Sequence, residues 1–182
     1  TGPKSLARRS AQTALHAITH AMLRWMAPFL SFTAEEAWKL AGRSESIFME
    51  TYSDLGAPDE ALLAKWSRLR EIRDGVNKEI ETVRTAGRLG SSLQANLTLT
   101  APPADHALLA SLGDDLKFVF IASAIELIAG ETLSTVVRAS SDTKCERCWH
   151  WRADVGHDPA YPTICGRCTS NLHGAGETRR FA

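Results

Sequence analysis

The chain has 182 residues, 21 basic and 21 acidic side chains, and a formal net charge of zero. This length suffices for one large domain or two small ones. No apolar run approaches the length of a membrane-spanning helix, which excludes an integral membrane protein. No signal peptide is visible, so we expect a cytoplasmic protein.

The charge is uneven along the chain. Residues 1–34, 61–90 and 138–182 are net basic, whereas residues 35–60 and 91–137 are net acidic. A polyanion could bind a face built from the basic segments. Solvated helix faces explain the same pattern more simply, and charge alone favours that interpretation.

The first half of the chain has helical periodicity. Apolar residues predict an amphipathic helix over residues 4–27. Thr33 and Glu36 have the spacing of a capping box, which predicts a short helix that ends at Gly42. Residues 47–53 show no period and predict a connector.

A long apolar stripe predicts a second amphipathic helix over residues 59–86. Trp25, Trp38 and Trp66 fall on the apolar stripes of the three helices. We therefore expect all three tryptophans to pack in cores.

The period then changes to two. Residues 92–100 alternate apolar with polar and predict a half-buried strand. Short helices over 105–112 and 114–121 and two strands over 125–128 and 133–137 are expected to follow. The sequence therefore predicts a small α/β unit after the helical part.

The four cysteines are the strongest chemical signal in the chain. Cys145 with Cys148 and Cys165 with Cys168 form two C-x-x-C pairs, sixteen residues apart. This spacing is typical of a structural zinc site. Two such pairs supply four thiolates in a tetrahedron with no open position. We predict one structural Zn²⁺ per chain, which stabilises the fold and does not activate water.

Two disulfides and a rubredoxin-like iron site are the alternatives. The chain does not resemble a small disulfide scaffold, which favours a metal over disulfides. His150, His157 and His173 lie near the cysteines, but four thiolates already fill a zinc shell. His16 and His20 lie one helical turn apart without a third ligand at suitable spacing, so we expect them to be surface or packing residues.

Several stretches together resemble bacterial isoleucyl-tRNA synthetases. Residues 25–38, WMAPFLSFTAEEAW, are similar to a run in the helical anticodon-binding domain of those enzymes. Residues 73–81, RDGVNKEIE, resemble the long helix that follows it, and residues 90–95, GSSLQA, resemble a motif before the first strand. CERCW at 145–149 and CGRC at 165–168 match the terminal zinc module.

The resemblance implies a mainly α fold with a small α+β unit. The expected domains are a partial helical bundle of the class I synthetase anticodon-binding type over 1–90, a small mixed domain over 91–140, and a four-cysteine zinc ribbon or knuckle module over 141–182. Helices that precede residue 5 in the family are missing here. An exposed apolar face on the first helix is the expected consequence.

The resemblance also implies a function, the C-terminal tRNA-binding region of an isoleucine–tRNA ligase. Such an enzyme attaches isoleucine to tRNA(Ile) with ATP. The adenylation motifs and the editing domain of the family are absent from this sequence, so this part should be non-catalytic. The expected partners are tRNA(Ile) and the remainder of the synthetase chain, with no membrane, in a monomer.

Candidate tRNA contacts combine positive charge with aromatic rings. Basic side chains can contact phosphates, and aromatic rings can stack on unpaired bases. The candidates are Arg73, Lys78, Arg147, Trp149, Arg152, Arg167, Arg179 and Arg180. Trp149 could instead pack over the metal site as the core of a small module.

Two other functions remain open from the sequence. One is the zinc-finger tail of a DNA-repair glycosylase, although such an enzyme should show a helix–hairpin–helix segment where a strand-containing unit is expected here. The other is a purely structural zinc module that joins subunits without touching nucleic acid.

Overall fold

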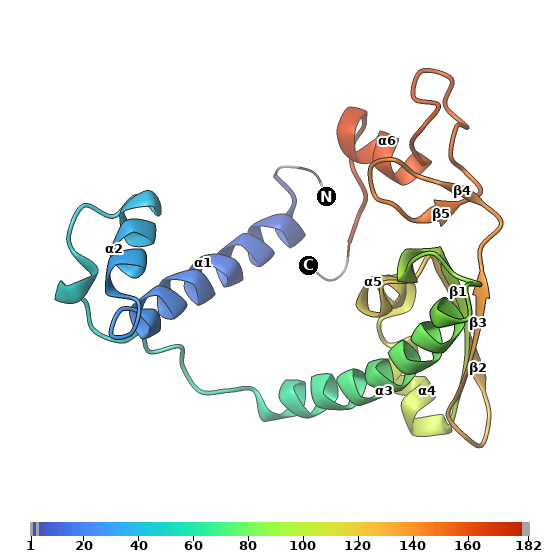
Figure 1. Cartoon of the computed structure of the whole chain (residues 1–182), viewed down its shortest axis with the longest axis horizontal. Coiled ribbons are helices and arrows are strands. Elements are labelled where there is room, and N and C mark those ends of the chain that lie inside the picture. Colours follow the sequence, from blue (N-terminus) through green and yellow to red (C-terminus); the bar gives the residue numbers. More distant parts are fainter. Residues whose placement is uncertain (1, 3, 180–182) are drawn as a thin grey trace. The chain divides into compact units, whose positions relative to one another are not determined.

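The computed structural model describes Gly2 and residues 4–179 (Figure 1). It divides into two compact units, one that runs to Pro58 and one that spans Asp59–Glu177. Helices, small sheets and a cysteine cluster together confirm the expected fold class. Among the described residues, no helix combines the length and apolar composition needed to cross a bilayer.

The first unit is helical. It contains α1 (Leu6–Met26), α2 (Ser31–Leu40) and the 3-10 turn η1 (Ile47–Met49). The Ser5 hydroxyl caps α1 by accepting the Arg8 N–H at 3.3 Å, which satisfies one of the free donors at a helix start. A small core lies between these elements and consists of Leu23, Ala27, Ala34, Trp38 and Ile47.

The predicted capping box at Thr33 is wrong. Helix α2 begins two residues earlier, at Ser31, whose hydroxyl donates to the Ala27 carbonyl at 3.0 Å. The chain therefore turns from α1 into α2 without needing Thr33 as a cap. The Glu35 carboxylate instead accepts the Ile47 N–H at 2.8 Å, and so fastens η1 to α2.

The predicted apolar face on the first helix is confirmed. Leu15, Ile18, Met22 and Trp25 follow the spacing of one helix face and are each about half exposed or more. The packing prediction holds for Trp38, which is 1% exposed, and is wrong for Trp25 at 49% and Trp66 at 39%. Helical periodicity predicts on which side of its helix a tryptophan lies. It does not predict whether another element covers that side.

The second unit is built on a three-stranded sheet in the order β2-β1-β3. Central strand β1 (Ala95–Ala101) pairs in parallel with β2 (Ala124–Ala129) and antiparallel with β3 (Ser134–Ala139). Strand β1 thus starts three residues later than the predicted start at residue 92, because residues 92–94 form the 3-10 turn η2 (Ser92–Gln94). Alternate residues of β1 are buried, as its sequence pattern predicts.

Helices connect and cover this sheet. A parallel pair of strands needs a crossover connection, and here α4 (Pro103–Ala110), the turn η3 (Gly113–Asp115) and α5 (Leu116–Phe120) connect β1 to β2. Long helix α3 (Glu60–Thr85) contacts β3 and α5, and Asp59 caps it by accepting the Leu62 N–H at 2.9 Å.

One apolar core joins α3 to the sheet. From α3 it takes Leu69, Ile72, Val76 and Ile80, and from the sheet and its helices it takes Leu97, Leu99, Leu109 and Phe120. The first turns of α3, which carry Leu62 and Trp66, lie outside this core and are partly exposed. The division of the chain at residues 90 and 140 stays a prediction, and α3 shares its core with the strands that follow it.

The last part of the second unit carries the cysteines. Two short strands, β4 (Thr143–Lys144) and β5 (Trp151–Arg152), pair antiparallel and form a small ribbon. Helix α6 (Gly166–His173) follows and has no counterpart in the elements expected from the sequence.

We expect Leu99→Ala to lower the free energy of unfolding of the second unit by about 3 kcal/mol, because Leu99 is fully buried in the central strand. Urea unfolding followed by circular dichroism in metal-replete buffer measures this. Leu63→Ala on the exposed side of α3 is the control and should cost under about 0.5 kcal/mol. Equal losses in the two variants would contradict the assigned core.

Candidate metal centre

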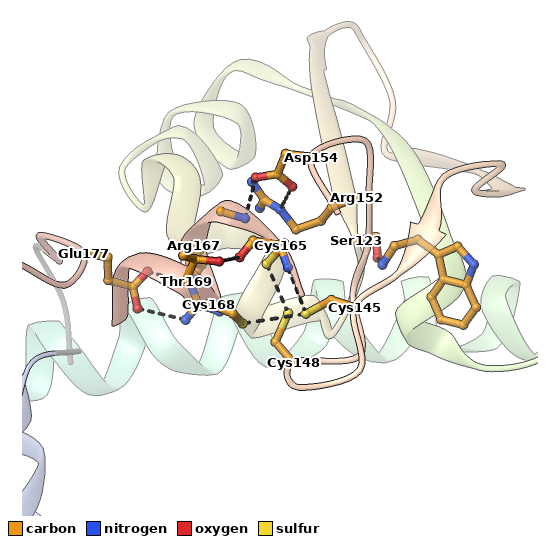
Figure 2. A network of polar contacts seen from close by, with 12 residues as sticks. Ser123, Cys145, Cys148, Arg152, Asp154, Cys165, Arg167, Cys168, Thr169 and Glu177 are labelled. Carbon is orange, nitrogen blue, oxygen red and sulfur yellow. Dashed lines mark hydrogen bonds and ion pairs between the residues drawn. The ribbon is translucent and has the colours of Figure 1, made fainter. Parts of the chain in front are cut away.

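The four cysteines converge from two short segments (Figure 2). Cys145 and Cys148 lie in the turn after β4, whereas Cys165 precedes α6 and Cys168 lies in its first turn. The first turn is closed by two backbone bonds, because Cys145 donates to the carbonyl of His150 and accepts from the N–H of Trp149, both at 2.9 Å. Local backbone geometry therefore aims each pair of sulfurs at one point.

The sulfur positions fit a tetrahedral metal ion. Cys145 Sγ lies 3.7 Å from Cys168 Sγ, and Cys148 Sγ lies 3.8 Å from Cys165 Sγ. All four sulfurs lie within 4.8 Å of one another. A metal–sulfur bond of about 2.3 Å gives a tetrahedron edge of about 3.8 Å. Because a disulfide bond is about 2.05 Å long, these free cysteines exclude the disulfide alternative.

Burial makes the cluster depend on a cation. Cys145, Cys165 and Cys168 are fully buried. Burial raises the pKa of the thiols of Cys148 and Cys165. At Cys145 burial acts the same way, but backbone N–H groups outweigh it and lower the pKa to about 6. Several buried thiolates repel one another, and a divalent cation removes that repulsion when it binds all four.

An ion pair holds α6 against the ribbon. Arg152 contacts both oxygens of Asp154, at 2.8 and 3.2 Å. The same carboxylate accepts the Gly166 N–H at 3.1 Å, so it satisfies a free donor at the start of α6. The Arg152 side chain is the main cause of the lowered pKa of Asp154. Asp154 therefore links the start of α6, between Cys165 and Cys168, to Arg152 on strand β5.

A second ion pair secures the other side of α6. Arg167 donates to the two oxygens of Glu177 at 2.6 and 2.9 Å. Its guanidinium also lies over the ring of Phe118, 4.7 Å from the centroid. The charges of Arg152 and Arg167 are therefore partly neutralised within the chain, although both remain partly accessible.

The other predicted tRNA contacts differ in exposure. Arg147 and Lys78 are exposed, and Arg73 is partly buried on α3. Arg179 is partly buried and has contacts of its own. Arg180 lies outside the described residues. All of these positions stay predictions as tRNA contacts.

Trp149 does not form a core for the module. It is 59% exposed, and its indole N–H donates to the Glu146 carbonyl at 3.1 Å. Its backbone has a φ of 65°, in the left-handed region that a bulky residue rarely adopts. The Lys144 ammonium lies 5.9 Å from its ring centroid. A strained backbone thus presents a large aromatic side chain to solvent.

The histidines stay outside the cluster. His150 Nδ1 is 3.1 Å from the Cys148 carbonyl oxygen, and the His173 ring stacks on Tyr161 at 4.0 Å. His16 and His20 contact each other through their rings in the first unit. Within Gly2 and residues 4–179, the four cysteines are the one group of three or more candidate ligands whose donor atoms meet.

The helical half of the chain matches a known family. Residues 1–99, out of 182, match the model described as the anticodon-binding domain of tRNA ligase. The chain belongs to this family. Residues 143–171, which include all four cysteines, match a second model described as a zinc finger found in FPG and IleRS.

Isoleucine–tRNA ligases from several bacteria align with this chain along its whole length. The isoleucine–tRNA ligases of Ralstonia pickettii and Cupriavidus taiwanensis are each 54% identical to it, and that of Bordetella pertussis is 55% identical. Each alignment covers 100% of this chain and 20% of the relative. The chain therefore spans about a fifth of the length of these relatives, and its resemblance to isoleucyl-tRNA synthetases is confirmed.

The family match of residues 1–99 distinguishes between the functions that the cysteine motif leaves open. The zinc-finger description names more than one kind of protein, so the cysteine motif alone does not decide between a synthetase and another finger-bearing protein. Residues 1–99 decide, because they match a tRNA ligase domain. The DNA-repair glycosylase alternative has no support in this half of the chain.

We expect Cys148→Ser to reduce the bound metal from one ion per chain to near zero and to unfold residues 142–178, because metal affinity contributes folding free energy in such modules. Atomic absorption on purified protein measures the metal, and hydrogen exchange measures the unfolding. His157→Ala, at an exposed histidine outside the cluster, should keep the full metal content. Unchanged metal in Cys148→Ser would refute the four-sulfur site.

Proposed function

We propose that this chain is the anticodon-recognising, tRNA-binding C-terminal part of an isoleucine–tRNA ligase. Two findings support the proposal together, the family match of residues 1–99 and the name carried by relatives that align with the whole chain. The parent enzyme would attach isoleucine to tRNA(Ile) with ATP, in the cytoplasm and as a monomer. Its catalytic and editing sites would lie outside this chain, which would itself be non-catalytic.

We assign the four cysteine sulfurs to one structural Zn²⁺. The sulfur separations of 3.7 and 3.8 Å support a tetrahedral ion, and four thiolates leave no position for an activated water. Iron in a rubredoxin-like site has the same ligand set and a similar geometry. Metal analysis of purified protein distinguishes the two ions.

The single observation that carries the RNA-binding proposal for the module is the exposed, strained Trp149. Backbone strain of this kind persists where the surrounding structure enforces it, and it concentrates at functional sites. An exposed indole near the Lys144 ammonium, with Arg147 two residues earlier in the chain, combines a stacking surface with positive charge. Such a surface suits an unpaired base and its phosphate.

The basic residues differ in how freely they could contact tRNA, because some of them already form ion pairs within the chain. Arg147 and Lys78 are exposed, so they can reach phosphates directly. Arg152 and Arg167 form bidentate pairs with acidic side chains, so their main effect should be on the shape of the module. In the proposed division of roles, residues 1–90 dock tRNA, 91–140 form a junction, and 141–182 hold the zinc.

A filter-binding competition tests the function. Unlabelled isoleucine tRNA transcript should displace labelled transcript from the chain far better than the same tRNA with a changed anticodon, and better than a duplex with a damaged base. If about four phosphates are contacted, affinity should fall about a hundredfold between about 50 and 200 mM salt. Equal weak binding to every nucleic acid would leave only a structural role for the module.

We expect Trp149→Ala and Trp149→Gly both to weaken tRNA binding about tenfold or more, because each removes a stacking surface. The two variants should differ in stability. Glycine adopts a positive φ without steric cost, so Trp149→Gly should be more stable than Trp149→Ala by about 1 kcal/mol.

Filter binding and thermal unfolding of the metal-loaded variants measure the two effects. Leu133→Ala, at a position that is 40% exposed in the proposed junction, controls for the loss of an exposed large apolar side chain. Undiminished tRNA binding by both Trp149 variants would remove the proposed stacking role.

A further inference from the structure

Ser123 lies where the α/β part of the second unit meets the cysteine module. It occupies the turn between α5 and β2 and is 7% exposed. Its hydroxyl accepts the Trp151 N–H at 2.7 Å and donates to the Leu93 carbonyl. Its own N–H donates to the Ala95 carbonyl at 2.9 Å. The Ser123 side chain therefore bonds to the turn η2, just before β1, and to β5 of the module, while its backbone N–H bonds to the start of β1.

The turn that presents Ser123 is strained. Ile121, two residues earlier, has a φ of 54°, and a β-branched residue rarely adopts this left-handed conformation. Ala122 between them is fully buried. Strain of this kind persists only where surrounding contacts enforce it. The Ala122 N–H donates to the Lys117 carbonyl at 3.0 Å on one side of the turn, and the bonds made by Ser123 hold the other side.

A second contact joins the same two parts. Phe118, on α5, meets the edge of the His150 ring at a centroid distance of 5.5 Å and lies under the Arg167 guanidinium at 4.7 Å. His150 belongs to the first cysteine turn and Arg167 to α6. Helix α5 and the turn after it thus contact both halves of the module, and neither Ser123 nor Phe118 belongs to the cluster of candidate metal ligands.

We infer that Ser123 is a positioning residue, which fixes the cysteine module on the sheet and so sets the orientation of Trp149 relative to α3. The inference rests on the proposed tRNA-binding function. Two surfaces held in one orientation bind one RNA more tightly than the same surfaces on a loose joint, because the second contact becomes intramolecular. Alanine at 123 would leave the Trp151 N–H and the Leu93 carbonyl without this partner.

The test compares Ser123→Ala with Ser111→Ala in the metal-loaded chain. Ser111 is a matched control, because its hydroxyl also donates to a backbone carbonyl, that of Leu108, but far from the module in sequence and near the end of α4. Three quantities are measured: zinc per chain, hydrogen exchange at the Trp151 amide, and affinity for isoleucine tRNA transcript.

For Ser123→Ala we expect unchanged zinc, exchange at the Trp151 amide at least tenfold faster, and tRNA affinity about tenfold weaker. Ser111→Ala should match the parent chain in all three. Ser123→Thr keeps the hydroxyl, and Ser123 lines a pocket of about 320 Å³. The threonine variant should therefore restore both slow exchange and affinity.

Other outcomes overturn the inference in distinguishable ways. Loss of zinc in Ser123→Ala would mean that the residue builds the metal site and does not position it. Unchanged exchange and unchanged affinity would mean that the junction is held without it. If Ser123→Ala does not fold, Phe118→Leu decides, and it should weaken tRNA binding with zinc retained. Failure of the parent chain to bind tRNA would instead refute the proposed function, while the exchange result would still report on the junction.

Discussion

The cysteine module depends on one constraint, which is that four closely spaced sulfurs, three of them on fully buried cysteines, must share a cation. Up to residue 179, where the description of the chain ends, the buried cluster around the sulfurs adds only Val155 and Ile164 as partly buried apolar neighbours, so the module has almost no other core there. So small an apolar core cannot offset the conformational entropy of the ordered segment. Ion binding therefore supplies much of the folding free energy of the module. The nearby ion pairs orient segments whose backbone is already fixed by the bound sulfurs.

This constraint also explains how the charged residues of the module are used. Arg152 and Arg167 lie within the chain's own ion pairs, and each pair fastens α6, which carries Cys168. A bidentate arginine–carboxylate pair has fixed geometry, which suits a short helix that needs orientation more than it needs strength. Arg147 and Trp149 lie in the first turn and remain exposed. In the proposed function, structural and recognition roles thus fall to different residues around one site.

Periodicity and spacing predicted much of this structure. Local sequence patterns, each read over a few neighbouring residues, predict the long helices, the alternating burial of β1 and the two cysteine pairs. The failures involve contacts between distant residues. Nothing near Thr33 in the sequence shows that Glu35 would bond to Ile47, twelve residues later. Likewise, Ser123 and Trp151 are 28 residues apart, and no local motif marks a serine that joins two elements.

The exposure of a side chain could not be predicted from the local sequence pattern either. Trp25 and Trp38 lie on similar apolar stripes and differ widely in burial. Whether an apolar face is buried depends on which element packs against it. Helix α3 illustrates this dependence, because its own apolar face is buried only where the sheet and its helices pack against it. Its apolar residues complete the core under the sheet. The cysteine module contacts α5 at Phe118 and the turn before β2 at Ser123. These contacts therefore join the module to elements whose core includes α3. Residue 90 separates two sequence patterns, but the side chains on either side of it pack together.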